Sequence, residues 1–233
     1  SVADDAGVKK MIDDTMAAFG RIDIIIANAG ILRDKSFSKM TQQDVDLVVD
    51  VHLLGTFKPF MAAWDIMKEQ GYGRLVVTTS STGLYGNFGQ ANYGAAKLGV
   101  VGLMNTLKIE GAKYDIKVNA VCPIAATRMT EGLMPPQMLE QLKPDYVTPG
   151  VINLVKEDAP SGVILSAGAG AFSMAQIVET RGAFVGQGEA LTAEAVAAKW
   201  DEITDTSTQT HFESGAGHGG NIFGRLQEAA QKA

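Results

Sequence analysis

Three side chains near the middle of the sequence have the types and spacing needed for proton transfer: Ser80, Tyr93 and Lys97. Tyr93 and Lys97 are four residues apart in a segment with helical periodicity, so they share one helix face. A nearby ammonium group is expected to lower the pKa of the phenol, which is ordinarily about 10. Ser80 would hold a substrate oxygen while Tyr93 exchanges its proton. A cofactor must carry the hydride, because no side chain does.

Alternating helical and apolar segments are expected to position these residues. Three- and four-residue periodicity predicts helices over residues 4–19, 41–67, 93–113 and 192–203. Apolar runs predict strands at residues 24–26, 73–81, 116–123 and 161–172. We expect the first strand to be central and buried on both faces, and Ser80 to follow the second on the ligand-binding side of the sheet. This alternation predicts an α/β fold with a doubly wound, Rossmann-like parallel sheet.

At these spacings the sequence resembles the short-chain dehydrogenase/reductase family, with Ser80, Tyr93 and Lys97 as its catalytic residues and NAG at residues 28–30 closing the preceding strand. The blocks ILRDKSF, HLLGTF, YGNFGQANYGAAKLG and RMT resemble the (3R)-hydroxyacyl-CoA dehydrogenase domains of type 2 multifunctional enzymes. The resemblance runs from about residue 1 to at least residue 200.

That resemblance implies a nicotinamide cofactor, NAD with NADP as the alternative, and a small-molecule acyl thioester substrate. Tyr93 is then the proton acceptor, Ser80 orients the substrate oxygen, and Lys97 also binds the nicotinamide ribose. His52 stands where the family commonly has asparagine, so its imidazole is expected to order the water of a proton relay. The alternative is a packed histidine without a catalytic part. The residues expected to bind the cofactor are Asn28, Gly30, Tyr93, Lys97, Ala125, Ala126, Thr127 and Arg128.

The family opens with a strand, a glycine-rich turn and a second strand that together bind the rest of the cofactor, and none of these precedes Ser1. We therefore expect a first βαβ unit to precede Ser1 in the functional protein. The dehydrogenase domain is predicted over residues 1–190 and a helical or flexible C-terminal extension over 191–233. The glycines of this extension are not expected to form a phosphate-binding loop, because the residues before them are mostly polar and predict no strand.

Several functions remain open on the sequence. The first is interconversion of (3R)-3-hydroxyacyl-CoA and 3-oxoacyl-CoA; an alternative is a reductase of 3-oxoacyl groups on a carrier protein or of another ketone. A third is a non-catalytic subunit or binding module that stabilises a complete partner. The family usually pairs through two long helices, so a homodimer or higher homo-oligomer is expected.

The composition excludes several classes of partner. The 233 residues include 26 acidic and 20 basic side chains, giving a net charge of −6 without a dense basic run, so nucleic acid is not an expected partner. No apolar run reaches the ~18 residues of a membrane span. The single cysteine, Cys122, fits a reducing compartment, and a cytoplasmic location is predicted.

The segment over residues 127–149 is rich in proline and irregular. It is expected either to cover the site, with Met129, Met134 and Met138 lining an apolar substrate, or to be a plain surface connection. No metal site is expected, because the three histidines of the chain lack ligand spacing. These histidines are His52, His211 and His218.

Overall fold

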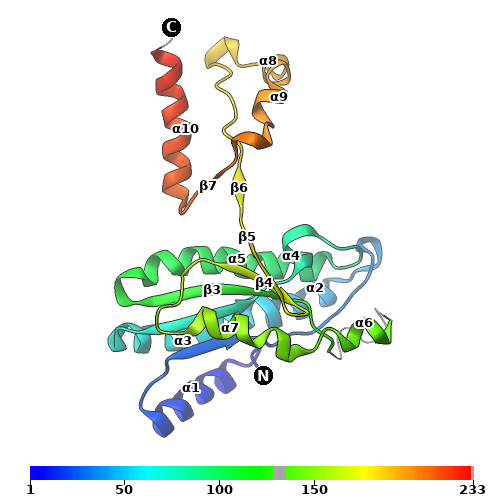
Figure 1. The fold of residues 1–233 in the computed structure, drawn as a ribbon, viewed down its shortest axis with the longest axis vertical. Helices are drawn as coiled ribbons and strands as arrows, with labels where there is room; N and C mark the ends of the chain where they lie inside the picture. The colour runs from blue at the N-terminus through cyan, green and yellow to red at the C-terminus, as the bar shows by residue number, and fades with distance from the viewer. Residues whose placement is uncertain (128–134, 232–233) are drawn as a thin grey trace. The chain divides into compact units, whose positions relative to one another are not determined.

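The computed structural model describes residues 1–127 and 135–231. The chain divides into two compact units, Ser1–Ala175 and Gln176–Ala233 (Figure 1). The division falls after the last strand of the main sheet, earlier than residue 190, where the sequence places the end of the dehydrogenase domain. The extent of that domain stays a prediction.

The first unit alternates helices with strands, as the sequence predicts. Its elements are α1 (Asp5–Phe19), β1 (Ile24–Ala27), α2 (Gln42–Val49), a π-helix (Asp50–Leu54), α3 (Gly55–Gln70), β2 (Gly73–Thr78), α4 (Ser81–Tyr85), α5 (Ala91–Gly111), β3 (Ile116–Pro123), α6 (Pro136–Glu140), α7 (Thr148–Val155), β4 (Ile164–Gly168) and β5 (Ala171–Ala175). The strands form one sheet in the order β1-β2-β3-β4-β5, parallel except for β5.

The sheet is covered by helices on both faces, which confirms the predicted doubly wound fold (Figure 1). Along β2 the buried side chains alternate between two clusters: Leu75 and Val77 pack with α3 and α5, whereas Val76 packs with α7. This period of two is what a strand requires when both of its faces are buried. The core therefore has two layers, separated by the sheet.

The first strand departs from expectation. β1 is parallel, as predicted, but it lies at the edge of the described sheet, and Ile24 and Ile26 are each 45% exposed. Ile25 and Ala27 pack against the cluster beneath α3, whereas α7 reaches β2 and β3. The predicted burial on both faces is therefore wrong for this strand, because only one of its faces is covered.

Two other expectations are corrected by local geometry. The single strand expected over residues 161–172 is a hairpin, in which Ala169 and Gly170 have positive φ angles of 51° and 79°. Two consecutive residues with positive φ make the tight turn that suits antiparallel strands. The long helix expected over residues 41–67 is interrupted by the π-helical turn Asp50–Leu54 just before Gly55. It begins where expected, because Thr41 and Asp44 form a capping box.

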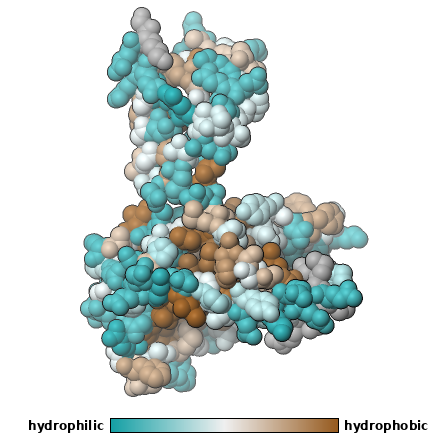
Figure 2. Space-filling view, in the orientation of Figure 1, coloured by the Kyte–Doolittle hydropathy of each residue, from teal (hydrophilic) through white to brown (hydrophobic). Residues whose placement is uncertain are grey.

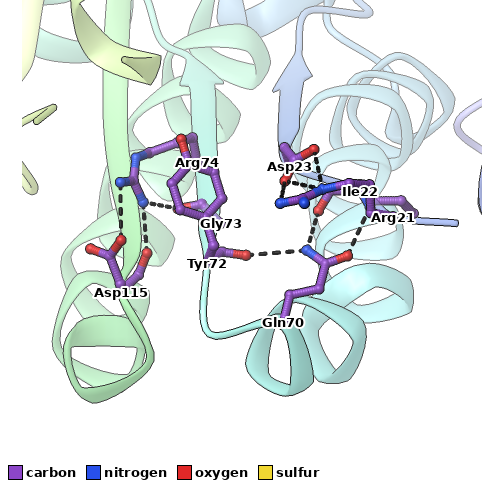
Figure 3. A network of polar contacts seen from close by, with 8 residues as sticks. All are labelled: Arg21, Ile22, Asp23, Gln70, Tyr72, Gly73, Arg74 and Asp115. Atoms are coloured by element: carbon purple, nitrogen blue, oxygen red, sulfur yellow. Dashed lines mark hydrogen bonds and ion pairs between the residues drawn. The ribbon is translucent and has the colours of Figure 1, made fainter. Parts of the chain in front are cut away.

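A buried arginine joins the elements at the amino-terminal edge of the sheet (Figure 3). Arg74 has no solvent-exposed surface, and its guanidinium donates to the carbonyl oxygens of Asp115, Lys156 and Glu157 at 2.6, 3.1 and 2.6 Å. It also pairs with the Asp115 carboxylate at 3.1 Å. These bonds satisfy a buried charge and bind carbonyl groups just beyond the carboxyl end of α7.

The neighbouring side chain in this network is Gln70, which pairs with the backbone before β1 (Figure 3). Its amide accepts from the Ile22 nitrogen at 2.9 Å and donates to the Ile22 oxygen at 2.7 Å. The two bonds imitate those of a neighbouring strand and fix where β1 begins.

The second unit has short elements and little core. They are β6 (Val178–Glu179), α8 (Ala193–Ala198), α9 (Trp200–Ile203), β7 (Thr210–His211) and α10 (Gly215–Ala230). Ser214 caps α10 by accepting from the Gly217 nitrogen, so the glycine-rich run begins a helix. Among its described residues no hydrophobic side chain is buried, and Trp200 and Phe223 are 57% and 67% exposed.

Apolar side chains also reach the surface of the first unit. Figure 2 shows them gathered over α7 and β5, where Ile152, Phe172 and Met174 are exposed. No helix within residues 1–127 and 135–231 is long and apolar enough to cross a membrane. The same part of the chain contains no cluster of three or more His, Cys, Asp or Glu side chains suited to a metal ion.

Candidate active site

Ser80 and Tyr93 meet at the carboxyl-terminal edge of the sheet, where β2 gives way to α4 and α5. Ser80 is the N-cap of α4, and its hydroxyl accepts from the Thr82 nitrogen at 3.2 Å. Tyr93 lies in the first turn of α5, where its phenol is close enough to the Ser80 hydroxyl for Ser80 to act on its pKa. Parallel strands place ligands at this edge, so the two hydroxyl groups stand where a substrate can reach them.

The phenol of Tyr93 is partly buried, and burial raises its pKa above the ordinary value. The Ser80 hydroxyl lowers the pKa of Tyr93, but this effect is smaller than that of burial. This differs from the lowered pKa expected from the sequence, because desolvation of the phenolate outweighs its stabilisation. The group is therefore held as a neutral phenol that can donate a proton.

Lys97 lies one helical turn from Tyr93 and is buried. Its ammonium donates to the Thr78 carbonyl oxygen at 2.5 Å and lies 5.6 Å from the centre of the Tyr93 ring. Burial lowers the pKa of Lys97 to about 8, so the group is still mostly charged at neutral pH. The predicted pair thus shares one helix face, with the positive charge beneath the tyrosine ring.

His52 also lies beside Tyr93, with the two ring centres 5.0 Å apart and the planes nearly perpendicular. It belongs to the π-helical turn, a distortion that often occurs at functional sites. Its Nε2 atom lies 3.0 Å from the Ile31 nitrogen and 2.7 Å from the Ile31 oxygen. Burial lowers the pKa of His52 to about 4, so the imidazole is neutral at pH 7. Its Nδ1 atom is buried and has no partner among the described residues.

Gly30 leaves room for this imidazole. A Cβ atom at Gly30 would lie 2.5 Å from Cε1 of His52, which is closer than any ordinary contact. Glycine is therefore required here for a close approach between the end of β1 and the His52 ring, rather than for an unusual φ angle.

The residues expected to bind a cofactor follow the ends of two strands at the same edge. Asn28 follows β1, and its Oδ1 atom accepts from the Thr78 hydroxyl at 3.2 Å. Ala125, Ala126 and Thr127 follow β3, and the Ala126 nitrogen donates to the Leu142 oxygen at 2.6 Å. Arg128, Met129 and Met134 lie outside the described residues, as does the side chain of Met138.

Two residues that the sequence did not single out are bonded into the same site. Asn92 is buried; its amide donates to the Asp44 oxygen at 3.1 Å and accepts from the Tyr93 nitrogen at 2.8 Å. Gln90, the N-cap of α5, donates to Asp34 at 2.7 Å. Their position beside Tyr93 in the segment GQANYG was the available signal, but their partners lie far away in the sequence.

Comparison with known proteins gives the same family throughout the first unit. The family model for short chain dehydrogenases matches residues 1–137. Peroxisomal multifunctional enzyme type 2 of Mus musculus is 46% identical over 215 residues, covering 90% of this chain and 29% of the mouse protein. A short-chain type dehydrogenase/reductase of Mycobacterium tuberculosis is 47% identical over 208 residues, covering 89% of this chain and 72% of that protein.

A solved structure agrees with these sequence matches. The full-length peroxisomal multifunctional enzyme type 2 of Drosophila melanogaster superposes with a TM-score of 0.82 at 36% identity, over 95% of this chain and 40% of that one. This chain thus spans less than a third of its mouse relative and less than half of the Drosophila chain. Residues 1–137, which the family model matches, include Ser80, Tyr93 and Lys97. The central sheet is mainly parallel, as expected for this family. The chain belongs to the short chain dehydrogenase family.

Proposed function

We propose that this chain interconverts (3R)-3-hydroxyacyl-CoA and 3-oxoacyl-CoA. The convergence of Ser80, Tyr93 and Lys97 at the carboxyl edge of the sheet carries the proposal. The sequence blocks that resemble type 2 multifunctional enzymes, together with the mouse relative, support an acyl thioester as substrate.

Each of the three side chains has a separate task. In the oxidative direction the substrate hydroxyl gives its proton to Tyr93 as phenolate, while the hydrogen on C3 leaves as a hydride. In the reverse direction the neutral phenol donates its proton to the oxygen of the 3-oxo group. Ser80 donates a hydrogen bond to that oxygen, and the charge of Lys97 stabilises the phenolate form.

A nicotinamide cofactor, when bound, accepts or supplies the hydride. The groups at the ends of β1 and β3 fit its nicotinamide half, because Asn28 and Gly30 are exposed and the Lys97 ammonium binds Thr78, whose hydroxyl binds Asn28. NAD is proposed, with NADP as the alternative. The full proposed set is Asn28, Gly30, Tyr93, Lys97, Ala125, Ala126, Thr127 and Arg128.

His52 is proposed to order the water of a proton relay. Its Nδ1 atom is buried without a partner among the described residues, and the charge of Lys97 is near enough to lower the pKa of the imidazole further. A neutral imidazole can donate or accept through this atom according to its tautomer, as a relay water requires.

A homodimer or higher homo-oligomer is proposed through α3 and α5. Between these helices lies a hollow of about 300 Å³ lined mainly by apolar side chains, including Phe57, Trp64 and Leu107. Met61 beside it is 72% exposed, so a second copy would cover an apolar surface. The exposed apolar side chains of the second unit support association as well. Light scattering coupled to size exclusion tests the assembly.

The location of the protein stays a prediction. The mouse and Drosophila relatives are named as peroxisomal, whereas the lone cysteine favours a cytoplasmic setting. Fluorescence imaging of the tagged full-length protein in its own cell distinguishes the two.

The activity is tested by following NAD reduction with (3R)-3-hydroxyacyl-CoA, beside the (3S) isomer, a 3-oxoacyl carrier protein with reduced cofactor, and a simple ketone. We expect turnover of the (3R) thioester and little of the others. Preference for the carrier protein or the ketone would replace the proposed substrate class. Calorimetric titration with NAD tests the non-catalytic alternative, which predicts no binding.

A further inference from the structure

Two loops that border the catalytic residues are joined by side-chain and backbone hydrogen bonds. One is the loop over residues 31–36, between β1 and α2; the other, over residues 86–90, connects α4 to α5. The Lys35 nitrogen donates to the Gly89 oxygen at 2.9 Å, and the Asn92 amide donates to the Arg33 oxygen at 3.3 Å. At their centre lies the side chain of Gln90.

Both the nitrogen and the oxygen of the Gln90 side-chain amide form hydrogen bonds. Its nitrogen donates to the Asp34 carboxylate at 2.7 Å, while its oxygen accepts from the Thr82 hydroxyl at 2.8 Å and from the Asn87 amide at 3.0 Å. An amide donates through its nitrogen and accepts through its oxygen, whereas an ionised glutamate only accepts and a leucine does neither. Neither leucine nor glutamate could make the same set of bonds.

Thr82 links the side chain of Gln90 to the catalytic serine, Ser80. Its hydroxyl is bound by Gln90, and its backbone nitrogen is bound by the hydroxyl of Ser80. Gln90 itself is the N-cap of the helix that carries Tyr93 three residues later. The side chain of Gln90 therefore bridges the elements that hold the two catalytic hydroxyl groups.

We propose that Gln90 is a positioning residue, held by Asp34, that fixes the distance between the hydroxyl groups of Ser80 and Tyr93. The inference rests on the proposed function only in naming those two residues as catalytic. If these two hydroxyl groups moved apart by a fraction of an ångström, proton transfer would weaken, because catalytic groups must be held close to their productive geometry.

The Asp34 charge has a second effect on the same site. Asp34 raises the pKa of Tyr93, which is also faced by His52, Lys97 and the Cys122 thiol. Replacing Asp34 by asparagine removes the charge but keeps an oxygen that Gln90 can bind. We expect Asp34→Asn to lower the titration midpoint of Tyr93 without loss of position, because the carboxylate charge that raises the pKa of Tyr93 is removed.

The decisive experiment exchanges donor and acceptor across the Asp34–Gln90 pair in the full chain. Gln90→Glu alone sets two carboxylates against each other, and we expect at least about a tenfold fall in kcat with a smaller change in KM. Adding Asp34→Asn restores one hydrogen bond, because the asparagine nitrogen donates to the new glutamate, which still accepts from Thr82. Gln90→Glu should also lower the denaturation midpoint and raise the titration midpoint of Tyr93, because it adds a second carboxylate beside the site. The double variant has one carboxylate in the pair, as the wild type has, so it should regain most of the lost kcat, of the denaturation midpoint and of the Tyr93 titration.

A matched control is available on α2. Gln42 donates to Asp46 at 2.7 Å on an exposed surface, and neither residue bonds to Gln90 or Asp34, so Gln42→Glu sets two carboxylates against each other outside the bridge. It should leave kcat and the Tyr93 titration unchanged. The Tyr93 titration is followed by NMR with isotope-labelled tyrosine and assigned with Tyr93→Phe.

The outcomes separate the two proposals. If Gln90→Glu matches the wild type, or the double variant is no better than Gln90→Glu, the positioning role is overturned. A different outcome is that the protein turns over no hydroxyacyl thioester while the double variant still restores both the denaturation midpoint and the Tyr93 titration. That result would overturn the proposed function and leave the bridging role of Gln90 in place. Rescue of the midpoint without rescue of the titration would reduce Gln90 to a purely structural residue and refute the inference.

Discussion

Replacement of Gly30 by alanine tests the packing on which the site depends. The new methyl group would lie 2.5 Å from Cε1 of His52, whereas carbon atoms in contact lie about 3.5–4.0 Å apart. The imidazole or the end of β1 must therefore move by about 1 Å. His52 is only 2% exposed and is bonded to the backbone of Ile31, so it has little freedom to yield.

Overpacking of this kind costs about 1–3 kcal/mol. With a urea m-value of roughly 2.5 kcal/mol/M, a loss of 2 kcal/mol lowers the unfolding midpoint by about 0.8 M. The chain has two tryptophans, Trp64 in the first unit and Trp200 in the second. Measuring fluorescence in a Trp200→Phe background therefore reports the unfolding of the unit that contains the site.

Two further variants test whether the clash with His52 causes the loss of stability in Gly30→Ala. Gly102 lies in the middle of α5 with open space around its Cβ position, so Gly102→Ala should raise stability by up to about 1 kcal/mol. Adding His52→Ala to Gly30→Ala should remove most of the clash, so the two changes should be non-additive. A Gly30→Ala protein as stable as the wild type, or fully additive with His52→Ala, would refute the close approach.

Three further predictions concern stability. Arg74→Met should cost about 3 kcal/mol, because it leaves the carbonyl oxygens of Lys156 and Glu157 without their charged donor; urea titration measures the loss and hydrogen exchange should place it in α7. Burial lowers the pKa of His52 to about 4 from its ordinary 6.5, so the unfolded chain binds the extra proton first and stability should fall as pH drops from about 6.5 to 4. Midpoints measured across that range should depend less on pH in His52→Asn. Ala169→Gly should raise the free energy of unfolding, measured by urea titration, by up to about 1 kcal/mol, since alanine is strained at a φ of 51°; a fall would contradict the turn geometry.

The sequence predicted what depends on local pattern. The apolar run of β2, the start of a helix at residue 41 and the end of a helix at residue 19 each rest on neighbours within a few positions, and the structure confirms them. Ser80 and Tyr93 could be placed together because the ends of parallel strands and the starts of their helices share one edge.

What the sequence missed depends on partners that are distant along the chain. The residues near Gln90 in the sequence do not predict its bond to Asp34, and those near Arg74 do not predict its bond to the carbonyl group of Glu157. Both contacts exist only once the sheet has formed. The exposure of Ile26 likewise depends on which strands and helices lie beside β1, whereas its apolar run reads like that of a central strand. The raised pKa of Tyr93 also follows from burial, which spacing alone does not reveal.

The central claim is that Tyr93 exchanges the proton of a 3-hydroxyacyl thioester. It is tested most directly by the rate of NAD reduction with (3R)-3-hydroxyacyl-CoA in Tyr93→Phe, beside Tyr114→Phe, which removes a hydroxyl group at the other end of α5. We predict that Tyr93→Phe loses at least about a hundredfold in kcat, the usual contribution of a positioned acid or base, while Tyr114→Phe keeps its rate. A Tyr93→Phe protein that retains full activity would contradict the account.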